Sequence, residues 1–149
     1  MASRRQLIGS GGPFEAKFGY SRAVRVGDHV AVAGTAAFKD GAPFAPGDAA
    51  AQTRHILGVI AAALAEAGAS MSDVVRYRVF VTDIGEYEAV GTELGEVFGE
   101  IRPAGTMVGN STLIHPDLVV EIEVDAIVGG GMGVLGGEAE AVDLSETES

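Results

Sequence analysis

The sequence predicts a single α+β domain in which one mixed β-sheet carries two helices on one face. Three observations lead to this prediction. Five stretches are apolar or alternate with a period of two, as strands do, and two longer stretches repeat apolar residues every three to four positions, as amphipathic helices do. These elements follow the order β-β-α-β-α-β-β. Each helix has one apolar stripe, so packing both helices on the same side of one sheet is the most economical arrangement.

The strands are predicted from alternation and from the residues that bound it. Gly27-Asp28 separates two such stretches, which is typical of a β-hairpin. In the third strand Val75, Tyr77 and Val79 are expected to face the same way, because side chains alternate between the faces of a sheet. The five strands are expected at 20–27, 28–37, 73–83, 104–114 and 118–128.

The two helices are predicted within 49–70 and over 84–100. Asp48 is a suitable N-cap for the first helix and Gly68 a suitable stop. Asp83 followed by Glu86 has the form of a capping box for the second helix. The glutamates of the second helix are expected on its solvated side, and its buried stripe is expected to be Tyr87, Val90, Leu94 and Val97.

Two regions of different composition divide the chain. Residues 1–128 are expected to form the domain, whereas residues 129–149 are rich in glycine and contain five acids but no lysine or arginine. A segment of that composition has little apolar surface to bury, so we expect a disordered, solubilising tail. A docking segment is the alternative. The apolar residues on the second face of the sheet predict self-association with cyclic symmetry.

Composition argues against several classes of function. The chain has no cysteine, which excludes disulfides, thiolate metal sites and a thiol nucleophile. Its net charge of −11 makes nucleic acid an unfavourable partner. With neither a signal peptide nor a membrane-spanning stretch in the sequence, we expect a cytoplasmic protein that does not enter a membrane. The three histidines lack the spacing of metal ligands, so no metal site is predicted; they are His29, His55 and His115.

The last predicted strand contains an unusual row of carboxylates. Glu121, Glu123 and Asp125 occupy every second position and therefore share one face of the sheet. Three like charges in a row are either a solvated outer surface or include a residue that takes part in chemistry.

Four segments resemble the RidA/YjgF family, and together they extend over about residues 12–128: "GYSRAVRVGDHVAVAGTA", "QTRHILGVIAAALAEAGASMSDVVRYRVFVTDI", "RPAGTM" and "LVVEIEVDA". The resemblance implies a chorismate-mutase-like fold and a homotrimer whose sheets form a central barrel, with ligand clefts between subunits. It also implies hydrolysis of reactive enamines and imines to 2-oxo acids and ammonia, without a metal or an organic cofactor. In such a site an arginine holds the substrate carboxylate and a glutamate activates water.

The resemblance assigns site residues by position. Tyr20 corresponds to the tyrosine of the cleft, Gly34 to the glycine that offers its backbone to the ligand, and Glu121 to the glutamate that handles water. Other positions depart from the family pattern. Ala33 stands where serine is frequent, Gly91 where asparagine is found, and Gly105 or Thr106 where the carboxylate-binding arginine is expected.

Two arginines are candidates to replace the missing one. Arg102 lies three residues before Gly105, and Arg22 follows Tyr20 by two positions, which would place both side chains on one strand face. The alternative is that both arginines are solvated. Two classes of function follow: a hydrolase of imines, enamines or a related carbonyl-derived compound, and a non-catalytic trimer that binds a small metabolite. Ribonuclease and chorismate mutase activities are disfavoured because the chain lacks the cations that either would need.

Overall fold

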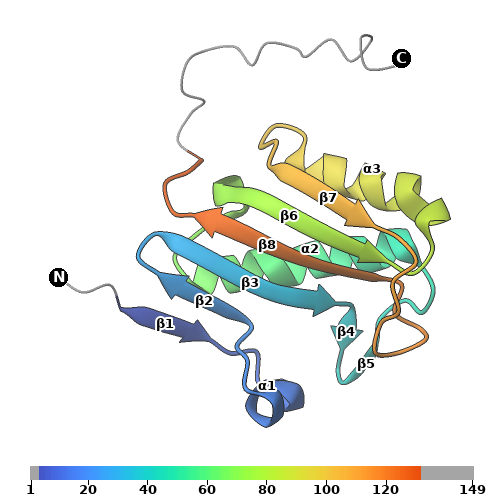
Figure 1. The fold of residues 1–149 in the computed structure, drawn as a ribbon, viewed down its shortest axis with the longest axis horizontal. Coiled ribbons are helices and arrows are strands. Elements are labelled where there is room, and N and C mark those ends of the chain that lie inside the picture. Colours follow the sequence, from blue (N-terminus) through green and yellow to red (C-terminus); the bar gives the residue numbers. More distant parts are fainter. Residues whose placement is uncertain (1–3, 132–149) are drawn as a thin grey trace.

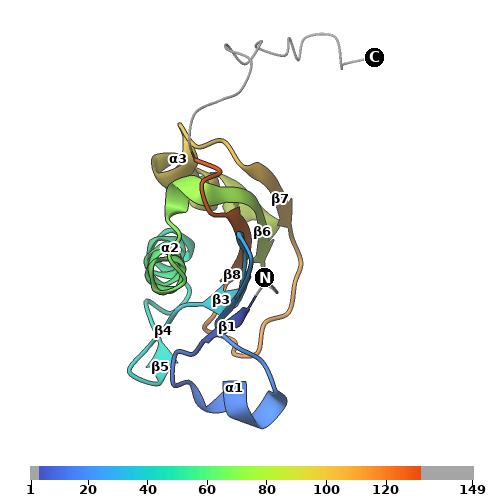
Figure 2. The same ribbon diagram turned by 90° about the vertical axis from the view of Figure 1, so that its left-hand side faces the viewer.

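The computed structural model describes residues 4–131. A six-stranded sheet has the strand order β1-β2-β3-β8-β6-β7, and the long helices α2 and α3 pack on one of its faces (Figures 1 and 2). Its strands are β1 (Arg5–Ile8), β2 (Ala23–Val26), β3 (His29–Ala36), β6 (Val74–Val81), β7 (Ala104–Val108) and β8 (Val120–Ile127). The helices are α1 (Pro13–Phe18), α2 (Ala49–Glu66) and α3 (Tyr87–Phe98), with short 3-10 helices at Met71–Asp73 and Ile84–Glu86. A two-stranded ribbon, β4 (Phe38–Lys39) and β5 (Ala42–Pro43), precedes α2.

The predicted α+β fold with a mixed sheet and two long helices on one face is confirmed. Strand β7 runs parallel to β6, and the other neighbouring strands of the sheet are antiparallel. The hairpin at Gly27-Asp28 joins β2 to β3, with Val26 opposite His29. Strand β1 and helix α1, which the sequence reasoning did not assign, extend the sheet beyond β2.

Strand β7 is shorter than predicted. It ends at Val108, whereas the sequence pattern extended it to residue 114. Asn110 adopts a left-handed backbone with φ of 56°, a conformation that interrupts an extended strand. The chain between β7 and β8 is therefore a loop, anchored where the Ser111 amide donates to the Val81 carbonyl at 3.0 Å.

Helix α2 is bounded as the sequence predicts. The Asp48 side chain accepts a hydrogen bond from the Ala51 amide at 3.0 Å, and Gly68 follows the helix with a φ of +81°. The fully buried Gln52 ties the helix to the segment that precedes β8. Its amide group donates to the carbonyls of Ala45 and Asp117, and its carbonyl oxygen accepts from the Val119 amide at 2.9 Å.

Strand β6 contains a β-bulge that the alternation pattern did not predict. Val74 pairs with Ala126 and Arg76 with Asp125, so Val75 is an additional residue in the strand. As a result Val74 is buried and Val75 is exposed, so Val75 does not face the same way as Val79, contrary to the prediction. Beyond the bulge, Tyr77 and Val79 share one face as expected, and both pack against the core on the helix side.

The buried stripe of α3 also differs from the prediction. Val90 and Leu94 are buried as expected, but the third buried residue is Phe98, whereas Tyr87 and Val97 are exposed. Val90, Leu94 and Phe98 are spaced by four residues and therefore lie on the side of α3 that packs against the sheet. Tyr87 is the first residue of the helix, and its side chain is exposed to solvent. One glutamate of this helix is not solvated either, because the mostly buried Glu93 side chain pairs with Arg54 of α2.

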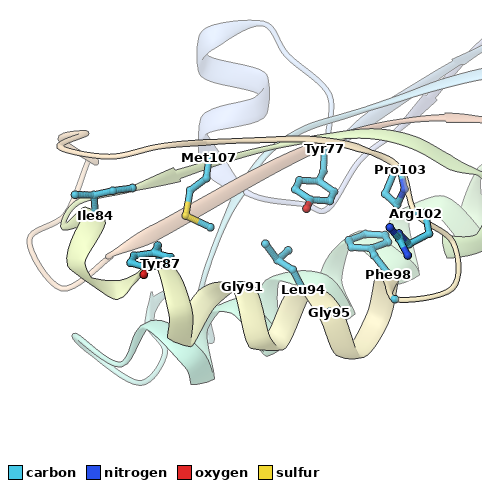
Figure 3. A pocket seen from close by; sticks show the side chains of 11 residues that line it. Tyr77, Ile84, Tyr87, Gly91, Leu94, Gly95, Phe98, Arg102, Pro103 and Met107 are labelled. Atoms are coloured by element: carbon cyan, nitrogen blue, oxygen red, sulfur yellow. The ribbon is translucent and has the colours of Figure 1, made fainter. Parts of the chain in front are cut away.

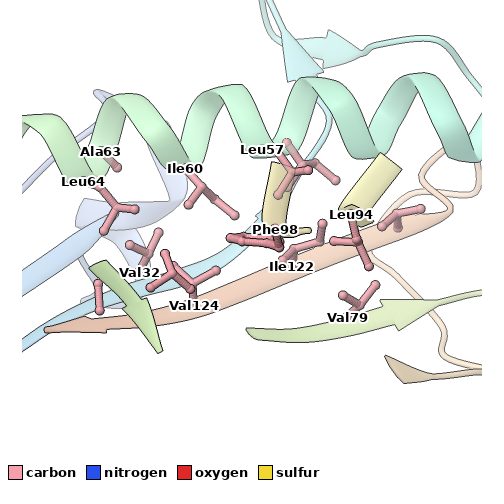
Figure 4. Close-up of a cluster of buried hydrophobic side chains, with 14 of the residues drawn as sticks. Val32, Leu57, Ile60, Ala63, Leu64, Val79, Leu94, Phe98, Ile122 and Val124 are labelled. Carbon is pink, nitrogen blue, oxygen red and sulfur yellow. The ribbon is translucent and has the colours of Figure 1, made fainter. Parts of the chain in front are cut away.

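The core lies between the sheet and the two long helices (Figure 4). Val32, Ile122 and Val124 of the sheet meet Leu57 and Ile60 of α2 there. The intervening side chains of β8 point to the opposite face, which we call the open face. At the end of β8 the chain turns, and the Gly131 amide donates to Asp73. The remainder of the predicted tail, from Met132 onward, lies outside the described residues.

Candidate functional site

Glu121 lies on the open face near the start of β8, beside Gly34 of β3. The pairing between these strands is irregular between Val32 and Thr35, and Gly34 lies within this irregularity. A Cβ atom at Gly34 would be 3.1 Å from both the carboxyl carbon and Oε2 of Glu121. The absence of a side chain at position 34 therefore allows the carboxylate to lie against the backbone of β3.

Arg22 is held beside the same backbone. Its Nη1 donates to the Gly34 carbonyl at 3.1 Å and to Thr35 Oγ1 at 2.9 Å, while its Nε is buried and has no hydrogen-bond partner among residues 4–131. The guanidinium carbon lies 5.9 Å from the centre of the Tyr20 ring. Arg22 is thus a half-buried, oriented cation.

The structure brings Tyr20, Arg22, Gly34 and Glu121 together, although the reason given for Arg22 was wrong. Tyr20 and Arg22 do not share a strand face, because β2 begins only at Ala23. Gly19 ends α1 in a left-handed conformation, and the residues after it lead the chain to β2. The Arg22 carbonyl nevertheless accepts a hydrogen bond from the Ala33 amide at 2.9 Å, which fixes this segment against β3.

The electrostatic environment distinguishes Glu121 from the other acids of β8. Burial raises the pKa of Glu121, the charge of Arg22 opposes that rise, and the neighbouring Glu123 adds to it. Arg78 pairs with Glu123 at 3.1 Å and lies 3.7 Å from Asp125. Among the described residues Glu121 forms no ion pair within 4.0 Å. Glu121 therefore differs from Glu123 and Asp125, which both lie within 4.0 Å of the Arg78 guanidinium.

Arg22 also influences a second carboxylate. Burial alone would raise the pKa of Glu15, but hydrogen bonds from Ser10 and the charge of Arg22 lower it below its usual value. The guanidinium of Arg22 therefore lies in the field of two acids. Glu15 accepts hydrogen bonds and has a lowered pKa, whereas Glu121 is partly desolvated and has a raised pKa.

Arg102, Gly105 and Thr106 do not join this cluster within one chain. Gly105 and Thr106 belong to β7, which β6 separates from β8. Thr106 pairs with Arg78 and so faces the open side, whereas Gly105 pairs with Tyr77 and faces the helices. Arg102 precedes β7 and is exposed, with a left-handed φ of 59°. The predicted site residues thus fall into two groups.

A cavity of about 560 Å³ lies between α3 and the β6–β7 edge of the sheet (Figure 3). Aromatic side chains line it together with Met107, as do two glycines of α3, Gly91 and Gly95, and Gly99, which follows the helix. Arg102 and Phe98 lie at one end, and Ile84 and Tyr87 at the other. The sequence reasoning noted Gly91 and Arg102 but missed the cavity; the signal for it was the four-residue spacing of Gly91, Gly95 and Gly99 in a helix.

Two of the three histidines, His55 and His29, contact other side chains or the backbone. His55 Nε2 lies 2.9 Å from the Phe38 carbonyl, and the ring stacks on Phe44. His29 lies 3.4 Å from Asp125 at the surface. Within residues 4–131, no group of three or more histidine or carboxylate side chains is arranged to hold a metal ion. None of the helices in this part of the chain has the length and apolar character needed to cross a membrane.

The strand order, the mixed pairing and the placement of both long helices on one face define a chorismate-mutase-like α+β domain. A family model described as Endoribonuclease L-PSP matches residues 13–128. The chain belongs to this family, which is also known by its YjgF and RidA members.

Known proteins agree with this assignment. The crystal structure of a YjgF/YER057c/UK114 family member from Mycobacterium tuberculosis has 49% sequence identity and a TM-score of 0.77, covering 84% of this chain and 100% of that one. An uncharacterised protein of Streptomyces coelicolor is 38% identical over 82% of this chain and 91% of its own length. The 3-aminoacrylate deaminase RutC of Acinetobacter baylyi is 43% identical over 51% of this chain and 60% of that protein.

Proposed function

We propose that this protein hydrolyses a small reactive imine or enamine beside Glu121, releasing a 2-oxo compound and ammonia. The observation that carries the proposal is Glu121 itself: a half-buried carboxylate with a raised pKa, free of ion pairs in residues 4–131 and set between Gly34 and Arg22. The similarity to a 3-aminoacrylate deaminase over half of the chain supports the same class of reaction. A cytoplasmic location and catalysis without a metal or organic cofactor are part of this proposal.

Glu121 acts as the general base and then as the general acid. Its carboxylate takes a proton from water while the water oxygen attacks the imine carbon, and it returns the proton to nitrogen when the carbon–nitrogen bond breaks. An enamine first takes up a proton on carbon and becomes the protonated imine. Water adds across the C=N bond to give a carbinolamine. As the carbon–nitrogen bond breaks, the hydroxyl group of the carbinolamine loses its proton to solvent, the carbonyl forms and ammonia leaves, so no oxidant or reductant is required. A raised pKa brings the carboxyl group closer to neutrality, where both proton transfers are favourable.

Arg22 is the cation proposed to hold an anionic group of the substrate. Its Nη1 is committed to Gly34 and Thr35, and no protein group in residues 4–131 accepts a hydrogen bond from Nη2. A substrate carboxylate would therefore receive one hydrogen bond and the full charge of a fixed guanidinium, in place of a two-pronged contact. Tyr20, beside the guanidinium, would cover the ligand.

The proposed assembly is a homotrimer with its clefts between subunits. The open face retains a charged network, including Arg78 and Glu123, and exposed aromatic residues lie next to it on α1, where Phe14 stacks on Phe18. Such a face is well suited to contact with copies of the same chain. Analytical ultracentrifugation should give three times the monomer mass, and a monomer at micromolar concentration would contradict this assembly.

The activity is tested with imines that form in solution. Mixing the protein with 2-aminoacrylate or 3-aminoacrylate generated in situ should accelerate formation of the 2-oxo or 3-oxo acid. Glu121→Gln should remove the acceleration, a loss of about 100-fold or more for a general base, while Glu123→Gln serves as the matched control on the same strand face. Equal rates for buffer, wild type and Glu121→Gln with both substrates would reject the proposal for these compounds.

A second candidate is a metabolite-binding protein without turnover. It is favoured by the absence of an arginine at Gly105 and at Thr106, the two positions where the resemblance implies the residue that binds a carboxylate. A metabolite that raises the melting temperature yet is recovered unchanged would support this candidate. A ribonuclease activity, which the description of the family suggests, is disfavoured by the net charge of −11, because phosphate backbones are repelled by acidic surfaces.

A further inference from the structure

Tyr77 occupies the space that a side chain at position 105 would need. Tyr77 and Gly105 pair directly in the parallel β6–β7 ladder. A Cβ atom on Gly105 would be 2.4 Å from the ring atom Cζ of Tyr77 and 2.5 Å from its hydroxyl oxygen. The ring is fixed on its other side by Phe98, with the two ring centres 5.2 Å apart and nearly parallel. The sheet edge can therefore contain the Tyr77 ring in this position or a side chain at 105, but not both.

The helix opposite this ring keeps open space. A Cβ atom added to Gly91 or Gly95 would meet no neighbouring atom within 4 Å, and both glycines line the cavity. Glycine inside a helix is destabilising relative to alanine, so packing does not explain two such residues on one side of α3. They leave a volume of about 560 Å³, which is within the range of small-ligand pockets.

A cation stands at one end of this apolar space. Arg102 lines the cavity next to Phe98 and makes no ion pair within 4.0 Å among residues 4–131. In the same part of the chain the Tyr77 hydroxyl, in the middle of the cavity, has no hydrogen-bond partner. Flat aromatic surfaces next to an unpaired guanidinium suit a molecule with an apolar ring and one anionic end.

We propose that Tyr77 and Gly105 form an exclusive pair that fits the cavity between α3 and β7 to a flat apolar ligand with a single carboxylate, which Arg102 holds. The cavity is on the helix side of the sheet, whereas Glu121 is on the open side. In the proposed trimer the positions of Gly91 and Gly105 belong to the same inter-subunit cleft as Glu121, so this proposal rests on the proposed function and deepens it by naming a class of ligand. Tyr77 decides which ligand the cavity accepts, because its aromatic ring lies where an arginine side chain at position 105 would place its charge.

Ligand binding can be followed by the protein's own fluorescence. The chain has no tryptophan and three tyrosines, of which Tyr77 and Tyr87 line the cavity. We expect 3-phenylpropionate to change the emission and to bind at least about tenfold tighter than propionate, which lacks the ring. The neutral 3-phenylpropanamide should bind about tenfold more weakly than the acid. Equal affinities for 3-phenylpropionate and propionate would overturn the proposal.

The site is located by matched variants. Arg102→Gln should lower the affinity for 3-phenylpropionate to that for the amide. Gly91→Leu fills the cavity and should reduce binding at least about tenfold, whereas Gly58→Leu, at an open position of α2, should leave it unchanged. A folded Gly91→Leu variant that binds 3-phenylpropionate as well as wild type would overturn the proposal. The proposal would also be overturned if the full-length wild-type protein did not bind 3-phenylpropionate, as expected when a second copy of the chain covers the cavity.

The exclusive pair is tested by a double-mutant cycle. Gly105→Arg alone should lower the melting temperature and fail to bind propionate, because the ring of Tyr77 obstructs the new side chain. Tyr77→Ala combined with Gly105→Arg should recover the melting temperature and gain propionate binding, a non-additive result. A Gly105→Arg variant as stable as wild type would refute the pairing. Glu121→Gln should bind 3-phenylpropionate like wild type, which separates this outcome from any failure of the proposed hydrolysis.

Discussion

The open face around Glu121 and the helix-side cavity around Tyr77 differ in how far they keep the pattern of the family. Around Glu121 the tyrosine, the glycine and the glutamate are all present, and the main departure is Ala33. Around Tyr77 the resemblance implies an asparagine at the position of Gly91 and an arginine at the position of Gly105 or Thr106, and this chain has neither. Gly91 and Gly105 lie on the helix side of the sheet, whereas Thr106 faces the open side. This difference is the basis for proposing that Glu121 keeps its role with water while the ligand differs from that of other family members.

The two regions also differ in how their polar groups are satisfied. Arg22 is tied to the backbone of β3 and lies within the fields of Glu15 and Glu121. Arg102, by contrast, is exposed at the rim of an apolar cavity. A fixed, half-buried cation suits a site where charge must be placed accurately, and an exposed cation suits capture of a ligand from solvent.

The largest effect on stability is expected from Gln52, which anchors the chain just before Glu121. Gln52→Met keeps the volume but leaves the carbonyl of Asp117 and the amide of Val119 without their partner. Each unsatisfied buried group costs about 1–3 kcal/mol, so we expect a loss of about 3 kcal/mol in the free energy of unfolding. Urea denaturation measures it. An equal loss of hydrolysis in the folded fraction would show that this anchor also positions Glu121, whereas ligand binding in the helix-side cavity should persist.

A smaller loss is expected from Arg22→Met. The change removes the hydrogen bonds to Gly34 and Thr35, at a cost of about 2 kcal/mol for bonds made by a charged donor. It also removes the positive charge that opposes the rise in the pKa of Glu121, so that pKa should increase further. Hydrolysis of an anionic substrate should fall, and its pH profile should move to higher pH. Arg78→Met is the control, since Arg78 pairs with other acids. An unmoved profile in Arg22→Met would remove Arg22 from the site.

Replacing a glycine within a helix by alanine is expected to increase the stability of the protein. Gly95→Ala and Gly58→Ala each place a methyl group in open space within a helix, so each should stabilise the protein by about 0.5–1 kcal/mol. Only Gly95→Ala should weaken binding of 3-phenylpropionate. Thermal melts and fluorescence titrations of both variants test this contrast. Loss of binding in both variants would mean that the effect is not local to the cavity.

The smallest expected effect is a pH dependence of stability. Because burial raises the pKa of Glu121, its ionised form is less favourable in the folded chain than in the unfolded one. Its contribution to stability is therefore complete below the ordinary value of 4.5 and is lost as the pH rises through the folded-state pKa. The melting temperature of Glu121→Gln relative to wild type should increase between about pH 4 and about pH 7. A difference that does not change with pH would mean that the carboxyl group is not desolvated.

Local pattern was sufficient for most of the fold. The alternation of β8, the N-cap Asp48 and the hairpin at Gly27-Asp28 depend on residues close in sequence, and all three are present in the structure. The bulge at Val75 and the end of β7 were missed, because both depend on how one strand pairs with another. The same reason explains Phe98, whose burial follows from its contact with Tyr77 on a distant strand.

The sequence by itself determined the class of fold, the row of carboxylates and the correspondence of Tyr20, Gly34 and Glu121 with the residues of a family. These are properties of period, of short-range spacing and of residue identity. The tertiary structure alone decided that Arg22 lies beside Glu121 while Arg102 lies across the sheet from it, and that Tyr77 fills the space above Gly105. Those outcomes depend on which strands become neighbours and in what register, and no local pattern contains that information.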